Sequence, residues 1–70
     1  MSDAKVSIDT EFIRLDDLLK LAGLCMTGGE AKRSIQMGFV RVNDQICTQR
    51  GRKLRLGDKV LFNGHTIVVN

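Results

Sequence analysis

The sequence predicts an α+β fold in which two packed helices lie against a small, curved and mostly antiparallel sheet. Two stretches of the first half place apolar residues at helical spacing. The second half alternates apolar and polar residues around tight-turn pairs, which is typical of short strands joined by hairpins. Helices packed on one side of such a sheet would bury the apolar faces of both.

The chain has 70 residues, enough for one domain, and we expect residues 1–70 to form it. Hydrophobic residues make up 43% of the chain, which is enough for one compact core. No apolar run reaches the length of about 18 residues that a membrane span needs. The N-terminal segment lacks the basic start and apolar block of a signal peptide. We therefore expect a cytoplasmic protein.

The first helix is expected over about residues 16–22. Its apolar residues share one face, at spacings i, i+3, i+4 and i+7: Leu15, Leu18, Leu19 and Ala22. Asp16 is the expected N-cap, because its carboxylate can accept hydrogen bonds from free N–H groups of the first turn. Gly23 can adopt a positive φ and end the helix. Lys20 is expected on the opposite, solvated face, and Asp17 is expected to be solvated as well.

The second helix is expected over about residues 28–37. Thr27 and Glu30 have the spacing of a capping box, in which each side chain bonds to the other residue's backbone N–H. One side of this helix carries small and apolar residues that would allow close approach to the first helix: Ala31, Ser34, Ile35 and Gly38. The other side carries polar residues: Lys32, Arg33 and Gln36.

Strand patterns occur at both ends of the chain. Residues 5–8 alternate like a half-buried strand. Four further strands are expected in the second half: residues 39–42, 45–47, 59–62 and 65–69. The pairs Asn43-Asp44 and Asn63-Gly64 are tight-turn signals and would join these strands into hairpins.

Charge is distributed unevenly along the chain. Residues 1–31 hold three Lys or Arg and six Asp or Glu, whereas residues 32–70 hold eight and two. The two parts therefore carry net charges of −3 and +6. Such separation indicates an anionic partner, and nucleic acid fits best.

The densest basic stretch places four cations within six residues: Arg50, Arg52, Lys53 and Arg55. An isolated run of this kind is usually a solvated loop. Here the run follows a basic helix face in a polarised chain, which favours contact with phosphates. The three aromatic residues, Phe12, Phe39 and Phe62, stand in apolar contexts and are expected in the core. A stacking platform for single-stranded bases is therefore not expected, and contact with the phosphates and shape of a folded RNA fits better.

Gly28 and Gly29 begin the second helix, at a cost of roughly 1 kcal/mol each in helix propensity. Two explanations remain open. A phosphate could approach the bare N–H groups at the positive end of the helix. Alternatively, the turn between the helices could be closely packed. The pair is not part of a P-loop, because no Gly-Lys-Ser/Thr follows.

No catalytic, metal or cofactor site is expected. Cys25 and Cys47 belong to no Cys-x-x-Cys pair, and with the single histidine, His65, they lack zinc-ligand spacing. His65 follows a hairpin turn and is expected to be exposed. The two cysteines are expected to be buried, reduced thiols, with a disulfide between them as the alternative. No base is paired with either thiol, which argues against an enzyme.

Several motifs in order resemble the S-four RNA-binding domain, a family named after a ribosomal protein and also found in pseudouridine synthases and tyrosyl-tRNA synthetases. The resemblance covers about residues 14–60, in four segments: residues 14–24, 27–32, 38–43 and 57–58. Residues 27–32 and 50–54 look closest to the stand-alone, YaaA/YbcJ-like branch of bacterial proteins. The resemblance implies an alpha-L RNA-binding motif and a binding unit without a catalytic domain.

The resemblance also implies which residues contact RNA: Arg14, Thr27, Lys32, Arg33 and the basic segment from Arg50 to Arg55. We add Gly28, Gly29 and Gln36 as neighbours on the same helix. Many family members have Ser-Arg where this chain has Thr27-Gly28, so one usual phosphate cation is missing. The usual Asn-Gly turn is Asn43-Asp44 here.

We therefore expect a monomeric protein that binds structured RNA, either ribosomal RNA or tRNA, as a ribosome-associated accessory factor. The alternative is a protein-interaction module that docks on an acidic partner. Competition by RNA, compared with competition by an acidic protein, would separate the two.

Overall fold

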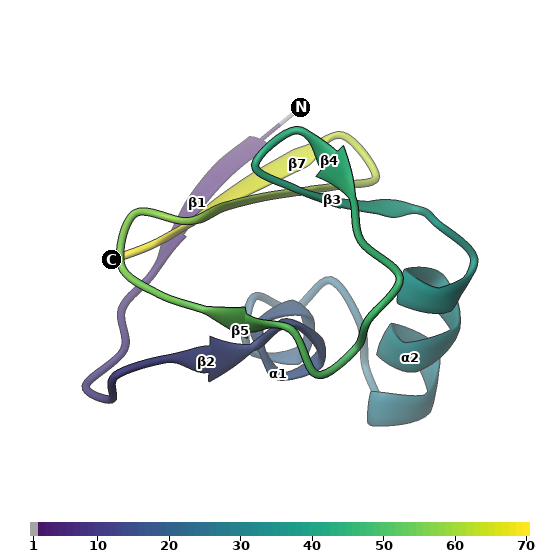
Figure 1. Cartoon of the computed structure of the whole chain (residues 1–70), viewed down its shortest axis with the longest axis horizontal. Coiled ribbons are helices and arrows are strands. Elements are labelled where there is room, and N and C mark those ends of the chain that lie inside the picture. The colour runs from purple at the N-terminus through teal and green to yellow at the C-terminus, as the bar shows by residue number, and fades with distance from the viewer. Residues whose placement is uncertain (1) are drawn as a thin grey trace.

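The computed structural model describes residues 2–70, and it confirms the α+β prediction (Figure 1). Its helices are α1 (Leu15–Leu21) and α2 (Gly28–Gln36). Its strands are β1 (Ser2–Val6), β2 (Ile13–Arg14), β3 (Val40–Val42), β4 (Gln45–Ile46), β5 (Lys53–Leu54), β6 (Lys59–Phe62) and β7 (His65–Val69).

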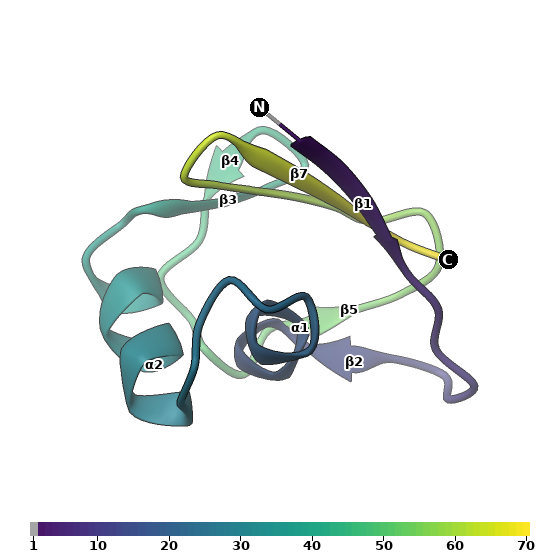
Figure 2. The ribbon, with the colours of Figure 1, turned by 180° about the vertical axis from the view of Figure 1, so that it is seen from behind.

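The elements form two layers, which Figures 1 and 2 show from opposite sides. A five-stranded sheet, in the order β1-β7-β6-β3-β4, is the upper layer. The lower layer contains both helices and the short β2–β5 ladder. The core lies between the layers, and its largest fully buried side chains come from both: Leu15, Leu18, Leu19, Ile35, Leu54, Ile67, Val40, Val60 and Val69.

Antiparallel hairpins build most of the upper sheet. β3 pairs with β4 and with β6, and β6 pairs with β7. The expected turns are confirmed, because Asn43 and Asp44 have φ of 50° and 70°, and Asn63 and Gly64 have φ of 53° and 80°. Positive φ at both central residues is the signature of a type I′ hairpin, whose twist matches that of the flanking strands.

The N-terminal strand lies earlier than predicted. β1 covers Ser2–Val6 instead of residues 5–8, and it pairs in parallel with β7, up to the match of Val6 with Val69. Ile8 lies beyond the strand, where its N–H donates to the Asn70 carbonyl at 3.1 Å. Pairing with a strand about 60 residues away decides these bounds, and local alternation cannot reveal that partner.

Helix α1 begins one residue earlier than predicted, and Asp16 is not its N-cap. Arg14 holds that position and makes no side-chain cap hydrogen bond. The N–H groups of Leu15 and Asp16 instead donate to the carbonyls of Arg52 and Arg50, at 2.9 and 3.1 Å. A neighbouring segment of backbone therefore satisfies the helix terminus that a side chain was expected to cap. Gly23, with φ of 77°, ends the helix region as predicted.

Helix α2 confirms half of the predicted capping box. The Glu30 N–H donates to Thr27 Oγ1 at 3.1 Å. The Glu30 carboxylate, however, accepts from the Met26 N–H at 3.3 Å instead of from that of Thr27. Ala31 and Ile35 are buried against the core, as the spacing predicts.

Two predictions about single side chains need correction. Phe39 is 58% exposed and Phe12 is only half-buried, so these two do not belong to the core, whereas the half-buried Phe62 packs against it as predicted. Phe39 directly precedes Val40, which starts β3 and is fully buried, and successive residues of an extended chain face opposite sides. His65 is half-buried at the start of β7 instead of exposed.

Both cysteines are buried free thiols, as predicted, so the disulfide alternative is wrong for this structure. Burial raises the pKa of the Cys25 thiol and the nearby Glu30 carboxylate raises it further, while a hydrogen bond with the Ser34 side chain lowers it. Within residues 2–70 no cluster of His, Cys, Asp or Glu could hold a metal ion. No helix in the described part of the chain is long and apolar enough to cross a membrane.

Candidate nucleic-acid-binding surface

The β2–β5 ladder brings Arg14 next to the basic segment that follows β4. Arg14 pairs with Lys53 across this ladder, and the adjacent Leu15 N–H donates to the Arg52 carbonyl. Two cationic regions that are far apart in the sequence thereby form one surface. We call it the basic ladder surface and define it by five exposed residues: Arg14, Arg50, Arg52, Lys53 and Arg55.

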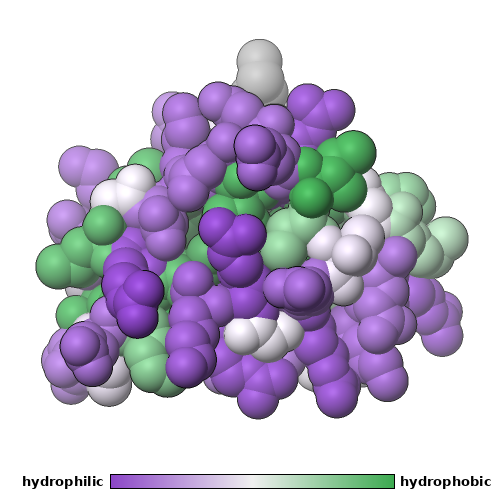
Figure 3. Space-filling view, in the orientation of Figure 1, coloured by the Kyte–Doolittle hydropathy of each residue, from purple (hydrophilic) through white to green (hydrophobic). Residues whose placement is uncertain are grey.

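Hydrophilic side chains cover much of the side of the molecule on which β2 and β5 lie (Figure 3). Leu54 is fully buried between Lys53 and Arg55, so strand alternation holds both cations on the outside. Apolar contacts inside the molecule therefore anchor the backbone that presents the cations.

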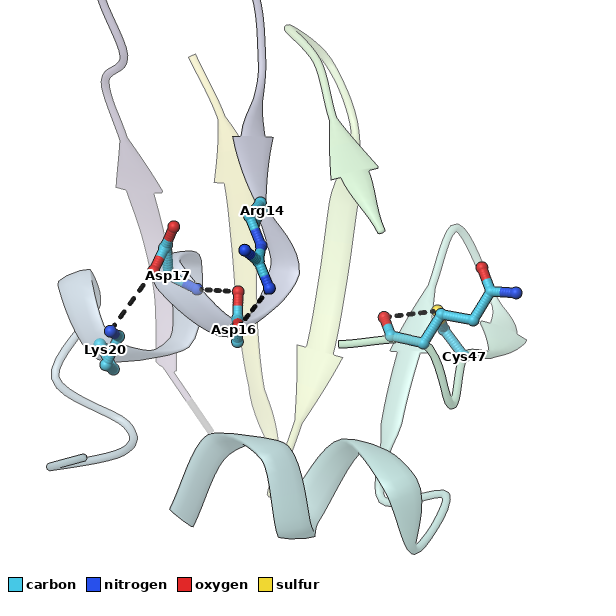
Figure 4. Close-up of polar contacts among 6 residues, drawn as sticks. Arg14, Asp16, Asp17, Lys20 and Cys47 are labelled. Atoms are coloured by element: carbon cyan, nitrogen blue, oxygen red, sulfur yellow. Dashed lines mark hydrogen bonds and ion pairs between the residues drawn. The ribbon is translucent and has the colours of Figure 1, made fainter. Parts of the chain in front are cut away.

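Two cations of the basic ladder surface are held by neighbouring side chains. The Arg14 guanidinium donates to the Asp16 carboxylate at 3.1 Å, and the Asp16 carboxylate also accepts from the Asp17 N–H at 2.9 Å (Figure 4). The Lys53 ammonium lies 4.9 Å from the centre of the Phe12 ring, within cation–π range. Such contacts limit the freedom of two long side chains before any ligand arrives.

The other three cations of this surface, Arg50, Arg52 and Arg55, form no ion pair within residues 2–70. Their charge is therefore not neutralised inside the molecule. Arginine presents several N–H donors in a planar fork that matches a phosphate group. The basic ladder surface thus combines two cations whose side chains are held by contacts within the protein and three that form no ion pair within residues 2–70. Cations of this type contact a nucleic-acid backbone.

Cys47 lies at the start of the segment that leads to this surface. Its thiol is buried and donates to the Gln49 carbonyl at 3.7 Å (Figure 4). Burial and this weak hydrogen bond fix the chain where it leaves the sheet. We assign Cys47 a structural role on this geometry.

A second polar group lies on α2. Lys32, Arg33 and Gln36 are exposed, on the side of the helix opposite the buried Ala31 and Ile35. Thr27, Gly28 and Gly29 are exposed at its N-terminus. Helix α2 therefore presents two cations and the backbone N–H groups of its N-terminus to solvent. These residues belong to α2, whereas the basic ladder surface is formed by β2, β5 and their flanking residues.

The glycines at the start of α2 are not required for close packing. A Cβ at Gly28 would have Lys20 Nζ as its nearest neighbour at 3.8 Å, and one at Gly29 would have Thr27 Oγ1 at 4.0 Å. Both are ordinary van der Waals distances to atoms of side chains. Of the two explanations for this pair, close packing of the turn is therefore wrong, and approach of a ligand to the helix terminus remains.

Lys20 is a candidate that the sequence patterns miss. Its ammonium group lies at the N-terminus of α2, beside Gly28, and it pairs with Asp17 at 3.3 Å (Figure 4). Helical spacing places Lys20 on the solvated side of α1, which is correct. The spacing within α1 gives no information about the turn that follows it. That turn brings the N-terminus of α2 against the side of α1 on which Lys20 lies. Lys20 therefore supplies a cation at the N-terminus of α2.

Asn43 and Asp58, by contrast, have structural roles. The Asp58 carboxylate accepts from the Asn43 side-chain amide at 3.2 Å and from the Arg55 N–H at 2.8 Å. The Asn43 side-chain oxygen accepts from the Lys59 N–H at 3.0 Å. These bonds tie the β3–β4 turn to the turn between β5 and β6, next to the basic ladder surface.

Comparison with known proteins decides the family. A model of the S4 domain matches residues 6–70. The chain belongs to the S4 domain family. Among its relatives, the probable ribosome maturation protein RlbA of Bacillus subtilis is 48% identical over 59 residues, which cover 84% of this chain and 83% of RlbA. The putative RNA-binding protein YbcJ of Escherichia coli is 39% identical over 57 residues, which cover 81% of each chain.

The S4 fold is also found among solved structures. The solution structure of YbcJ from Escherichia coli, described as having an alfaL motif involved in RNA binding, superimposes with a TM-score of 0.72 at 35% identity. The match covers 93% of this chain and 84% of YbcJ. The expected resemblance to the stand-alone S4 branch is confirmed. These relatives are named for RNA binding and ribosome maturation, in agreement with the prediction that the chain is not an enzyme.

Proposed function

We propose that this S4 protein binds structured RNA, with ribosomal RNA as the first candidate and tRNA as the second. The observation that carries the proposal is the basic ladder surface, where pairing of Arg14 with Lys53 gathers cations from two distant segments. Cations at such a density release counterions from a phosphate backbone, and this release drives association. The names of the relatives RlbA and YbcJ support RNA as the polyanion and ribosome maturation as the process.

The proposed contacts are those of the basic ladder surface together with Lys20, Lys32, Arg33, Gln36 and the N-terminus of α2. Phosphate oxygens would accept from the guanidinium groups and from the free N–H groups of Gly28 and Gly29. The helix dipole places partial positive charge at the same point. With three phenylalanines and no other aromatic residue, the chain depends on phosphate position and RNA shape more than on stacking.

In this proposal the protein acts as a cytoplasmic monomer, an accessory factor for the ribosome or its precursors. Crosslinking in cells, followed by sequencing of the RNA recovered with the protein, tests it. We expect one dominant structured RNA, and a marked loss of that RNA for the double variant Lys32→Glu and Arg52→Glu. A charge-matched unrelated protein is the control. Recovery no greater than with this control would favour a protein partner with an acidic surface.

A further inference from the structure

Phe39 exposes an aromatic ring at the junction between α2 and the upper sheet. It is 58% exposed, and together with Phe62 and Asn63 it lines an open depression of about 490 Å³. This volume is in the range of pockets that hold small organic groups, about 300–1,000 Å³. The residues that line it are two phenylalanines and one asparagine, and an asparagine side chain can both donate and accept hydrogen bonds.

The depression adjoins the helix that carries Lys32 and Arg33. The Phe39 N–H donates to the Ser34 carbonyl at 3.1 Å, so the backbone of Phe39 is tied to the last turn of α2. RNA that follows the polar side of α2 toward its C-terminus would therefore reach this ring. Continuity along one helix connects the depression to the proposed RNA contacts.

Arg41 supplies a cation near the same place. It lies two residues after Phe39 in β3, is exposed, and forms no ion pair within residues 2–70. Its cross-strand neighbours, Ile46 and Leu61, are apolar. Residues i and i+2 of an extended chain face the same side, so an uncompensated cation follows Phe39 on that side and suits a ligand that carries both an anionic group and a flat ring.

We propose that this depression binds one unpaired nucleobase of the bound RNA, stacked on Phe39, with its edge at the Asn63 amide and a flanking phosphate at Arg41. The proposal rests on the proposed function and extends it to RNA that has a single-stranded nucleotide next to a helix. Stacking on an aromatic side chain tolerates any base, because every base has a π face. An apolar side chain of a protein partner is the competing occupant, and it would leave Arg41 without an anion.

The chain contains no Trp and no Tyr, so Phe39→Trp introduces the only such fluorophore. Two synthetic RNA hairpins with the same stem serve as probes, one blunt and one with a short single-stranded extension. We expect the extended hairpin to quench the emission of Phe39→Trp and the blunt hairpin to leave it unchanged. Lys5→Trp, on the edge strand β1 three strands away from β3, is the control and should respond to neither.

Affinity gives the second readout. We expect Phe39→Ala to weaken binding of the extended hairpin by about 5- to 100-fold and to leave binding of the blunt hairpin unchanged. Equal affinities of wild type and variant for the extended hairpin, or equal losses for both hairpins, would overturn the base-binding proposal while RNA binding itself stands. If the wild type bound neither hairpin, this inference would fall together with the proposed function.

Discussion

Lys20 Nζ lies 3.8 Å from the point where a Cβ of Gly28 would stand, so α1 delivers a cation to the N-terminus of α2. The Asp17 carboxylate, 3.3 Å from the ammonium, holds it there. A cation thus lies at the helix terminus where the N–H groups of Gly28 and Gly29 are free. The proposed contact of this terminus with a phosphate depends on both, and each can be removed separately.

Replacing Lys20 with alanine should weaken the proposed RNA binding and reduce its dependence on salt. Loss of one phosphate contact should make the slope of log affinity against log salt concentration shallower by about 0.7–0.9. Binding titrations at several salt concentrations measure this slope. Lys5→Ala, which removes a cation from β1, is the matched control and should leave the slope unchanged. Equal slopes for Lys20→Ala and wild type would exclude Lys20 as a contact.

The double substitution Gly28→Ala and Gly29→Ala should stabilise the protein and weaken RNA binding. Both added methyl groups have room, and alanine loses less backbone entropy on folding, so we expect the two substitutions together to raise the free energy of unfolding by about 1–2 kcal/mol. The methyl groups would also crowd a phosphate at the helix terminus. We therefore expect the double variant to bind RNA about tenfold more weakly, the equivalent of about 1.4 kcal/mol.

Urea denaturation and RNA titration of this double variant separate stability from binding. A variant that is more stable and binds RNA as tightly as wild type would show that no phosphate approaches these N–H groups. A less stable variant would contradict the structural finding that close packing does not require glycine here.

Asp16 should matter for stability although it is not the helix cap. Its carboxylate accepts from the Arg14 guanidinium and from the Asp17 N–H, and Asp16 is only 9% exposed. We expect Asp16→Ala to lower the free energy of unfolding by about 1.5–3 kcal/mol, the range for hydrogen bonds to a charged group. Asp17→Ala, at an exposed position of the same turn, should change it by no more than about 0.5 kcal/mol. Urea denaturation of both variants measures the difference.

The Cys25 thiol should make stability fall at alkaline pH. Burial and the Glu30 carboxylate raise its pKa above the ordinary value of 9.0, so the folded state favours the protonated thiol. This contribution is fully present below the pKa of the unfolded chain and is lost as the pH rises through the pKa of the folded state. Between pH 8 and pH 11, the free energy of unfolding of wild type should therefore fall more steeply than that of Cys25→Ala. Parallel curves would show that the thiol does not titrate differently on folding.

The helices and hairpins could be predicted because their signals are local. Thr27 and Glu30 mark the start of α2, and Asn43-Asp44 and Asn63-Gly64 adopt the positive φ that their type I′ turns require. Side chains that depend on neighbours close in sequence can be placed from the sequence alone. The same holds for Gly23, which ends α1.

The features that could not be predicted depend on distant pairing. β2 and β5 have two residues each, too few to show a period, yet their ladder places Arg14 beside Lys53. The carbonyls of Arg50 and Arg52, just before β5, cap α1. The position of Lys20 depends on how the turn after α1 folds. Phe39 and Val40 are adjacent in an extended chain, so only one of them can face the core. In the structure Val40 does, which leaves Phe39 exposed. Composition therefore indicates an anionic ligand, but only the tertiary structure indicates which cations act together.

The salt dependence of RNA affinity, compared between wild type and the double variant Lys32→Glu and Arg52→Glu, tests the central claim most directly. If about four to six phosphates are contacted, log affinity should fall with log salt at a slope of roughly −3 to −5. The double variant should bind at least about tenfold more weakly, with an unchanged circular dichroism spectrum and a shallower slope. A folded double variant with the affinity and slope of wild type would place the RNA-binding site elsewhere on the protein.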